Sequence, residues 1–187
     1  MDITQSNYIG INLKSIKMKK LLSLLIIDTA FTSCNTSVES EKIAGKWLLD
    51  DSRFEKGYMA GDQKDYDLVK TFLDAYENMD PQTMVDLSAE TVKFHPADIG
   101  GVFDVDMTNT DFIVERQSNW DSISRDYIFI MPLKMEDSKN RVVTTAFTET
   151  RYVKDGTSES INFYERLYIN EQDQIMRVVQ YSRPPND

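Results

Sequence analysis

The chain has 187 residues, 41% of them hydrophobic, and its 31 acidic residues against 21 basic ones give a formal net charge of −10. This length has room for one domain with a real core and an additional segment. The acidic balance, with no Lys/Arg cluster beyond Lys20, excludes a nucleic-acid-binding surface, which needs a basic patch. It also disfavours electrostatic docking on anionic lipid. With one cysteine, the chain forms no internal disulfide.

Residues 1–33 have the composition of an export signal. A basic start at 18–20 precedes an apolar segment at 21–31 that is too short to span a membrane, and Cys34 follows. The small residues before the cysteine resemble a bacterial lipobox, which implies that Cys34 is lipidated. We therefore expect 1–33 to be an upstream extension plus signal peptide that starts at Met18. The product is then expected in the bacterial cell envelope, held by a lipid on Cys34; an incidental free thiol is the alternative.

Residues 34–64 are expected to form a tether and an N-terminal extension. Residues 35–42 are polar, and Gly45-Lys46-Trp47 resembles the Gly-x-Trp motif that opens lipocalin-like barrels. The next segment contradicts a barrel, because its apolar residues recur at helical spacing. Trp47 is therefore expected to pack outside the domain or within this extension.

Three helices are expected, at residues 66–79, 82–88 and 112–123. Each carries apolar side chains on one face. Asp65 or Asp67 is the candidate N-cap of the first helix. Asp80 followed by Pro81 marks the start of the second, because proline suits the first helical position.

Strands are expected at residues 91–95, 126–135, 141–153, 160–170 and 175–183, with a short one at 102–105. These segments alternate and are rich in Val, Ile, Thr, Tyr and Phe. The Asp155-Gly156 pair favours a tight hairpin, and Pro132 implies an edge position or a bulge. The last three strands follow one another with short turns, which predicts an antiparallel meander covered on one side by the helices.

This order of elements resembles the nuclear transport factor 2-like superfamily, which includes ketosteroid isomerase, scytalone dehydratase and the SnoaL-like polyketide cyclases. The matching phrases are DLVKTFLDAYENMDPQTMVDL for the helix pair, TVKFHP for the first strand and FYERLYINEQDQIMRVVQYSR for the final strands. The resemblance implies an α+β fold. In it a strongly curved antiparallel sheet wraps about three N-terminal helices as a cone-shaped barrel with a pocket. We place this domain at residues 65–187.

Alternation along the long strands leaves two mixed faces, so the pocket face depends on the register. The face expected to be concave carries Phe147, Phe163, Leu167 and Val179. That register brings to the pocket rim Glu149, Arg151, Glu165 and Tyr181. A different register would turn all of these side chains outward.

The candidate catalytic residues are His95, Glu149, Glu165 and Tyr181. His95 ends the first strand, where enzymes of the superfamily often place an acid or base, and histidine suits general-base catalysis. Ketosteroid isomerase chemistry needs a carboxylate base opposite an oxyanion hole that includes a tyrosine, so Glu149 or Glu165 is the candidate base. The alternatives are cross-strand ion pairs for the glutamates and a hydrogen-bonded loop residue for the histidine.

Six aromatic residues are expected to line the pocket, namely Phe72, Tyr76, Trp120, Tyr127, Phe147 and Phe163. The alternative is that they fill the core. We expect no metal, since the aspartates at 98, 104 and 106 lack a two-histidine or cysteine partner set. We expect no cofactor, since the chain has no phosphate loop or dinucleotide turn.

The leading interpretation is an exported, lipid-anchored homodimer that binds a small apolar or mixed ligand and has no assignable catalytic activity. One alternative is an isomerase, dehydratase or cyclase that uses His95 or a strand carboxylate as general base. The other is a homodimeric interaction module that uses the outer face of the sheet. A cavity that places a carboxylate or His95 near a tyrosine would favour the enzyme.

Overall fold

A computed structural model describes residues 42–139 and 141–185. The expected signal segment and Cys34 lie outside these residues. The described strands are β1 (Gly45–Lys46), β2 (Gly57–Ala60), β3 (Ser88–His95), β4 (Phe103–Asp106), β5 (Trp120–Met135), β6 (Arg141–Val153), β7 (Ser158–Ile169) and β8 (Ile175–Arg183). The described helices are α2 (Gln63–Glu77), α3 (Pro81–Asp86) and α4 (Asp111–Gln117).

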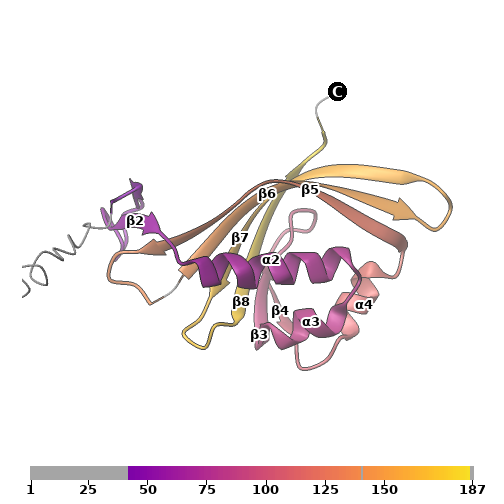
Figure 1. Ribbon diagram of the computed structural model, residues 1–187, viewed down its shortest axis with the longest axis horizontal. Helices are drawn as coiled ribbons and strands as arrows, with labels where there is room; N and C mark the ends of the chain where they lie inside the picture. The colour runs from indigo at the N-terminus through magenta and orange to yellow at the C-terminus, as the bar shows by residue number, and fades with distance from the viewer. Residues whose placement is uncertain (1–41, 140, 186–187) are drawn as a thin grey trace, which may run out of the picture. The chain divides into compact units, whose positions relative to one another are not determined.

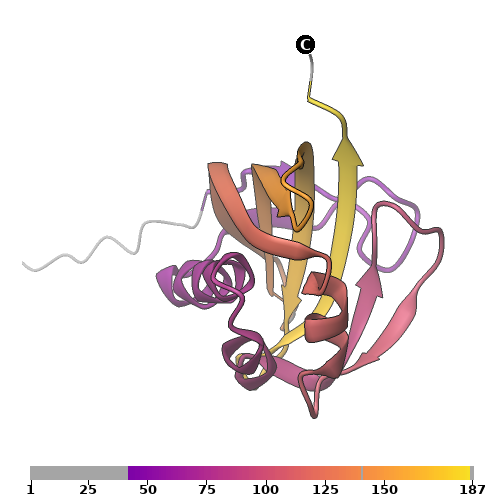
Figure 2. The same cartoon turned by 90° about the vertical axis from the view of Figure 1, so that its right-hand side faces the viewer.

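The strands form one open sheet in the order β1-β2-β5-β6-β7-β8-β3-β4. The sheet is curved, and all three helices lie on its concave side (Figures 1 and 2). The expected α+β class with a curved sheet around three helices is therefore confirmed. One pairing differs, because β3 and β8 run parallel and make the sheet mixed. The chain between these strands is long enough to allow either direction, so no tight turn imposes the antiparallel one.

The first helix begins three residues before the expected start, and neither predicted N-cap residue caps it. Asp62 occupies the N-cap position and makes no side-chain capping bond. Asp65 is buried instead, and its carboxylate pairs with Arg141 on β6 at 2.7 Å. This pair ties the start of α2 to the sheet, while Val69 and Leu73 of the same helix pack in the core.

The start of the second helix is confirmed and the length of the third is wrong. The Asp80 side chain accepts a hydrogen bond from the Thr83 backbone N–H at 3.1 Å, with Pro81 at the first helical position. Helix α4 ends at Gln117. Trp120 and Ile123 belong to β5, which pairs with β6 from Trp120↔Val153 to Lys134↔Arg141. The long ladder overrides the helical spacing of the apolar residues.

Part of the expected extension belongs to the sheet. Strand β2 pairs with the end of β5, as in Tyr58↔Met135. Trp47 packs on Tyr58 with ring centroids 6.4 Å apart and stacks on the guanidinium of Arg53. Pro132 pairs with Val143 of β6, and its carbonyl accepts a hydrogen bond from the Gly61 N–H just past the end of β2.

The predicted register is right on β6 and β7 and wrong on β8. Phe147 and Leu167 point inward and are fully buried. On β8, Val178 faces inward, while Tyr181 is 59% exposed on the outer face. The pairing shifts between Tyr168 and Ile169, where an additional residue of β8 forms a bulge. One additional residue exchanges the two faces of a strand, and Val179 therefore also lies outside.

Within the described residues, no helix is long and apolar enough to cross a membrane.

Candidate functional site

A cavity of about 70 Å³ lies between the concave face of the sheet and helices α2, α3 and α4. Its apolar walls are formed by Phe72, Leu73, Met84, Val92, Phe94, Val105, Met107, Phe112, Ile113 and Val178. The polar side chains that line it are Tyr76, Ser88, Arg116, Arg125, Glu149, Arg151, Glu165 and Gln180. An apolar cavity with a few convergent polar groups is the usual form of a small-molecule site.

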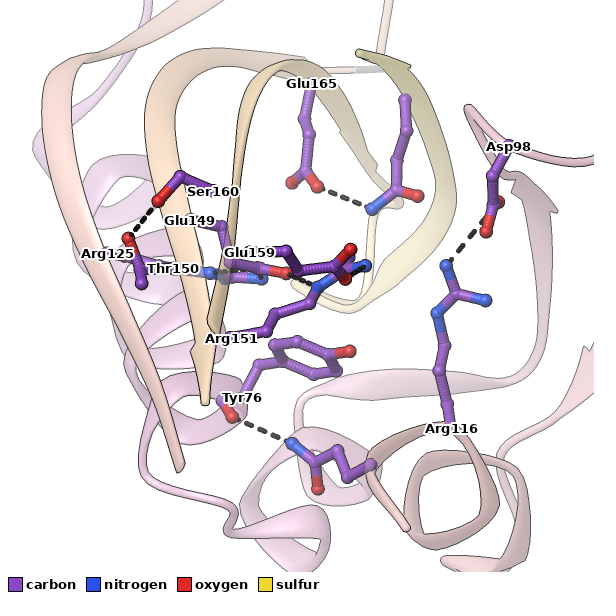
Figure 3. A network of polar contacts seen from close by, with 12 residues as sticks. Tyr76, Asp98, Arg116, Arg125, Glu149, Thr150, Arg151, Glu159, Ser160 and Glu165 are labelled. Carbon is purple, nitrogen blue, oxygen red and sulfur yellow. Dashed lines mark hydrogen bonds and ion pairs between the residues drawn. The ribbon is translucent and has the colours of Figure 1, made fainter. Parts of the chain in front are cut away.

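One carboxylate holds two arginines at the inner end of the cavity. Arg125 donates to one oxygen of Glu149 from Nε at 2.8 Å and from Nη2 at 2.6 Å. Arg151 donates from Nε to the other oxygen at 2.6 Å. These residues come from neighbouring strands, β5 and β6, whose inward-facing positions place the three groups together (Figure 3). Both oxygens of Glu149 are therefore occupied by cations, and this carboxylate is not free to act as a base.

Aromatic rings surround the two guanidinium groups. The guanidinium carbon of Arg125 lies 4.6 Å from the ring centre of Tyr76 and 4.5 Å from that of Phe147. Arg151 lies 4.4 Å from the ring of Trp120. These contacts add cation–π attraction to the ion pairs and exclude water from them. The cluster is thus a fixed structure of the inner face of the sheet.

Glu165 differs from Glu149, although both are buried on adjacent strands. It is 2% exposed and forms no ion pair among the described residues. Gln180, directly opposite on β8, donates a hydrogen bond to it at 2.6 Å. Burial raises the pKa of Glu165, and the charge of Arg125 and the bond from Gln180 oppose this only partly. The Gln180 side-chain oxygen is buried without a hydrogen-bond partner in the described part of the chain.

Tyr76 and Arg116 complete the polar lining from the helical side. Burial raises the pKa of Tyr76 to about 12, so its hydroxyl stays protonated and can donate. In Figure 3 the hydroxyl points into the space between Arg151 and Arg116. Arg116, on α4, lies over the ring of Phe94 and reaches Asp98 at 3.7 Å, longer than a direct hydrogen bond.

Four of the ten predicted catalytic or pocket-lining residues line the cavity, namely Glu149, Glu165, Phe72 and Tyr76. Trp120, Tyr127 and Phe147 do not line it. Trp120 and Phe147 pack against the arginines, and Tyr127 lies on Phe147. Phe163 contacts Phe147 and borders a shallow groove elsewhere on the sheet.

His95 and Tyr181 do not face the cavity. Phe94 lines it, so the next residue on the strand, His95, points to the other face. There it accepts a hydrogen bond from Arg177 at 3.1 Å, and burial together with Arg177 lowers its pKa. Tyr181 packs on Tyr164 on the same outer face. The structure therefore does not bring these two predicted residues to the site.

Sequence reasoning missed Arg116, Arg125 and Gln180 as lining residues. Arg125 was placed before the strand that holds it, because β5 begins six residues earlier than predicted. Simple alternation puts Gln180 on the outer face, but the bulge in β8 turns it inward. Arg116 lies within the predicted third helix, but helical spacing alone does not show what its side chain contacts. Cross-strand pairing with Glu165 is the signal that would have placed Gln180 on the cavity face.

The acidic loop is occupied by protein contacts. Asp104 pairs with Lys93 at 3.0 Å, and Asp106 accepts hydrogen bonds from Thr108. In the described ranges there is no group of three or more His, Cys, Asp or Glu residues that could hold a metal ion.

No protein-family model and no curated protein matches the chain, but solved structures match its fold. A candidate aromatic ring hydroxylase from Novosphingobium aromaticivorans is 15% identical with a TM-score of 0.55, over 64% of this chain and 87% of that one. A candidate calcium/calmodulin-dependent protein kinase II association domain from Xanthomonas campestris is 14% identical with a TM-score of 0.53, over 78% and 96%. A candidate SnoaL-like polyketide cyclase from Shewanella denitrificans is 8% identical with a TM-score of 0.51, over 65% and 92%.

At these identities the matches establish architecture and leave activity open. The protein therefore has the nuclear transport factor 2-like fold, which it shares with the candidate SnoaL-like polyketide cyclase.

Proposed function

We propose that this protein is an exported, lipid-anchored domain that binds a small organic ligand in the cavity beneath its sheet. The observation that carries the binding proposal is the set of polar groups aimed into an otherwise apolar cavity. Glu165 is buried with no ion-pair partner among the described residues, and Gln180 keeps an unpartnered oxygen beside it. Folded proteins rarely bury polar groups without a hydrogen-bond partner, because each such group lowers the free energy of unfolding by about 1–3 kcal/mol. A ligand that completes the bonding would recover this free energy.

The volume limits the size of the ligand. Pockets for drug-sized molecules measure about 300–1,000 Å³, and this cavity measures about 70 Å³. A steroid-sized molecule does not fit without opening of the helices, so we expect a ligand of a few heavy atoms.

A filling substitution tests the binding proposal. Val178→Phe places a ring in the cavity, while Val179→Phe makes the same change on the outer face of the same strand. A library of fragments below about 200 Da, screened by ligand-observed NMR, should contain binders of the wild type and of Val179→Phe that Val178→Phe does not bind. A library without any binder, or equal binding by both variants, contradicts the proposal.

General acid–base catalysis is the second candidate function, favoured by the raised pKa of Glu165, which lines the same cavity as the phenol of Tyr76. A carboxyl group of this kind exchanges a proton with a carbonyl compound bound beside it. Small ketones incubated with the protein in D₂O would then gain deuterium next to the carbonyl, at a rate that Glu165→Gln removes. A rate unchanged by the substitution leaves ligand binding as the function.

Export and anchoring are proposed from the sequence alone, since residues 1–41 lie outside the described part. The basic start at Met18, the apolar segment and Cys34 together support them. The expected result is that the wild type fractionates with bacterial membranes and Cys34→Ala does not. A Cys34→Ala protein that stays with the membranes contradicts lipidation.

We also propose that the protein pairs with a second copy through the outer face of the sheet. Ile128 is 71% exposed there, and Phe129, Tyr164 and Tyr181 form a ladder of contacting rings. Exposed apolar groups gathered in one area mark interaction surfaces. Sedimentation equilibrium should show a dimer that Ile128→Asp disrupts and that Val114→Asp, an exposed control on α4, leaves intact. A monomeric wild type contradicts this pairing.

A further inference from the structure

The cavity carries an excess of positive charge, although the whole chain has a net charge of −10. Three arginines line it, at positions 116, 125 and 151, against two glutamates. Glu149 is shared between two of the arginines, so that cluster keeps one positive charge. The remaining partners of the arginines, Asp98 and Glu159, are both more than half exposed to solvent.

Three hydrogen-bond donors of this lining are unused by the described residues. Arg151 donates from Nε to Glu149 and from Nη1 to Glu159, and its Nη2 makes no hydrogen bond to a described residue. Arg116 forms a 3.7 Å ion pair and a cation–π contact with Phe94, but no hydrogen bond to a described residue. The Tyr76 hydroxyl has no bonding partner in the described ranges, and it points between the two arginines (Figure 3). All three residues line the same cavity.

These three residues direct hydrogen-bond donors into the cavity, and no described residue supplies a matching acceptor. A ligand that carries acceptors would complete the arrangement. A carboxylate offers two oxygens with about four lone-pair sites and matches the planar guanidinium group in geometry. Charge-assisted hydrogen bonds of this kind are roughly twice as strong as neutral ones, most of all away from bulk water. The remaining wall is apolar, contributed by side chains such as Phe94, Phe112 and Ile113.

We propose that the cavity binds a small organic carboxylate, held at its charged end by Arg116, Arg151 and Tyr76 with its short apolar body against the helical wall. This identity of the ligand rests on the proposed binding function and makes it specific. The small volume selects short chains. Glu165 stands on the neighbouring strand and is engaged by Gln180, and burial raises its pKa, which weakens its repulsion of an anion. Phosphate lacks an apolar body and leaves the greater part of the wall without contact.

Isothermal titration calorimetry with a matched series of ligands tests whether binding requires the negative charge of the ligand. The straight-chain carboxylates from acetate to hexanoate are compared with their primary amides, which have the same shape and no charge. We expect the best carboxylate to bind at least tenfold more tightly than its amide, and its affinity to fall as the salt concentration rises. Equal affinities of acid and amide would overturn the proposal, while such binding would still support a ligand pocket.

Substitutions at position 116 test the site. Arg116→Gln should remove the preference for carboxylates, and Arg116→Lys should keep the charge but bind more weakly, since lysine lacks the planar fork. Arg183→Gln, an exposed arginine of β8 outside this cavity, serves as the control and should bind as the wild type does. Arg116 pairs with one exposed carboxylate and lies over the ring of Phe94, so urea unfolding of each variant is measured alongside binding to confirm that it folds. An unchanged preference in Arg116→Gln overturns the proposal.

Two further outcomes separate this proposal from the general function. Inorganic phosphate that binds with a dependence on Arg116, where the carboxylates do not bind, overturns the carboxylate class and keeps an anion site. If every fragment whose binding Val178→Phe blocks is neutral, the carboxylate proposal is wrong, but the proposal of a ligand-binding cavity stands. No binder of any kind contradicts both proposals.

Discussion

Each face of the sheet carries residues that its environment does not favour: the inner face buries charged side chains among its apolar ones, and the outer face exposes large apolar side chains. On the inner face, β5, β6 and β7 bury Arg125, Glu149 and Glu165. On the outer face, the same strands expose Ile128 and Tyr164. Burial of charge is costly and exposed aromatic residues invite association, so neither face is optimal for a monomer that only has to fold.

These unfavourable residues on the two faces indicate where function is located. An arrangement that opposes the hydrophobic effect persists where something other than stability requires it. Inside, the ionic groups end at a cavity, which suits a ligand. Outside, the rings lie on a flat surface with a shallow groove, which suits a partner. The following substitutions test whether the two faces differ as strongly as this account requires.

The largest effect is expected from Glu149→Ala. The substitution removes the carboxylate between Arg125 and Arg151, and breaking a buried pair in this way costs about 3–5 kcal/mol. Urea unfolding should show the loss as a lower midpoint. Glu159→Ala is the control, since its carboxylate is exposed and a surface pair is worth about 0–1 kcal/mol. Equal losses in the two variants would show that the cluster is no more important than a surface ion pair.

A smaller loss, about 3 kcal/mol, is expected from Leu167→Ala on the inner face. Leu167 is fully buried against the core, so the truncation removes apolar contacts and leaves a void. Val179→Ala truncates an apolar side chain on the outer face of the paired strand and should cost less than half as much. Thermal unfolding of the two variants in parallel measures the difference. A Val179→Ala loss as large as that of Leu167→Ala means that the outer face is covered, as by a second copy.

The sequence predicts much of the architecture, because strands β6 and β8 and the start of α3 are specified by local signals. Alternation, the Asp-Gly turn and the Asp80-Pro81 cap act over a few residues and are independent of the rest of the fold. The end of α4 is different. The apolar residues near Trp120 fit a helix, and only pairing with the distant strand β6 makes them a strand.

The site is less predictable than the fold, for a related reason. Glu149 and Glu165 were placed on the correct face by alternation alone. Tyr181 was misplaced because a single-residue bulge in β8 reverses the alternation, and no local residue type announces it. The charges of the site were also hidden, since a sequence shows which residues are acidic or basic but not that Arg125 and Arg151 share one carboxylate.

A gain of stability is expected from Glu165→Gln, in contrast to the loss at Glu149. Burial raises the pKa of Glu165 in the folded state above its ordinary value of 4.5. As the pH rises through the interval between these two values, the unfolded chain releases the proton and the folded chain retains it, so wild-type stability falls. The variant lacks this fall and should be more stable than the wild type at pH 8 and equal to it near pH 4.

Urea midpoints measured from pH 4 to pH 8 test this sign. Asp65 is also buried with a raised pKa, so a slope of the same sign should remain in the variant. A Glu165→Gln protein that is less stable than the wild type at pH 8 would mean that the carboxylate is ionised and held by the arginines, as Glu149 is.

The smallest effect is expected from His95→Gln on the outer face. His95 accepts a hydrogen bond from Arg177, and burial together with that arginine lowers its pKa in the folded state. The unfolded chain therefore gains a proton first as the pH falls below 6.5, and the wild type loses stability on the acid side. The glutamine variant should be within about 0.5 kcal/mol of the wild type at pH 7 and should bind carboxylates equally well. A tenfold loss of affinity would show that the histidine communicates with the cavity through the strand, and the separation of the two faces would then fail.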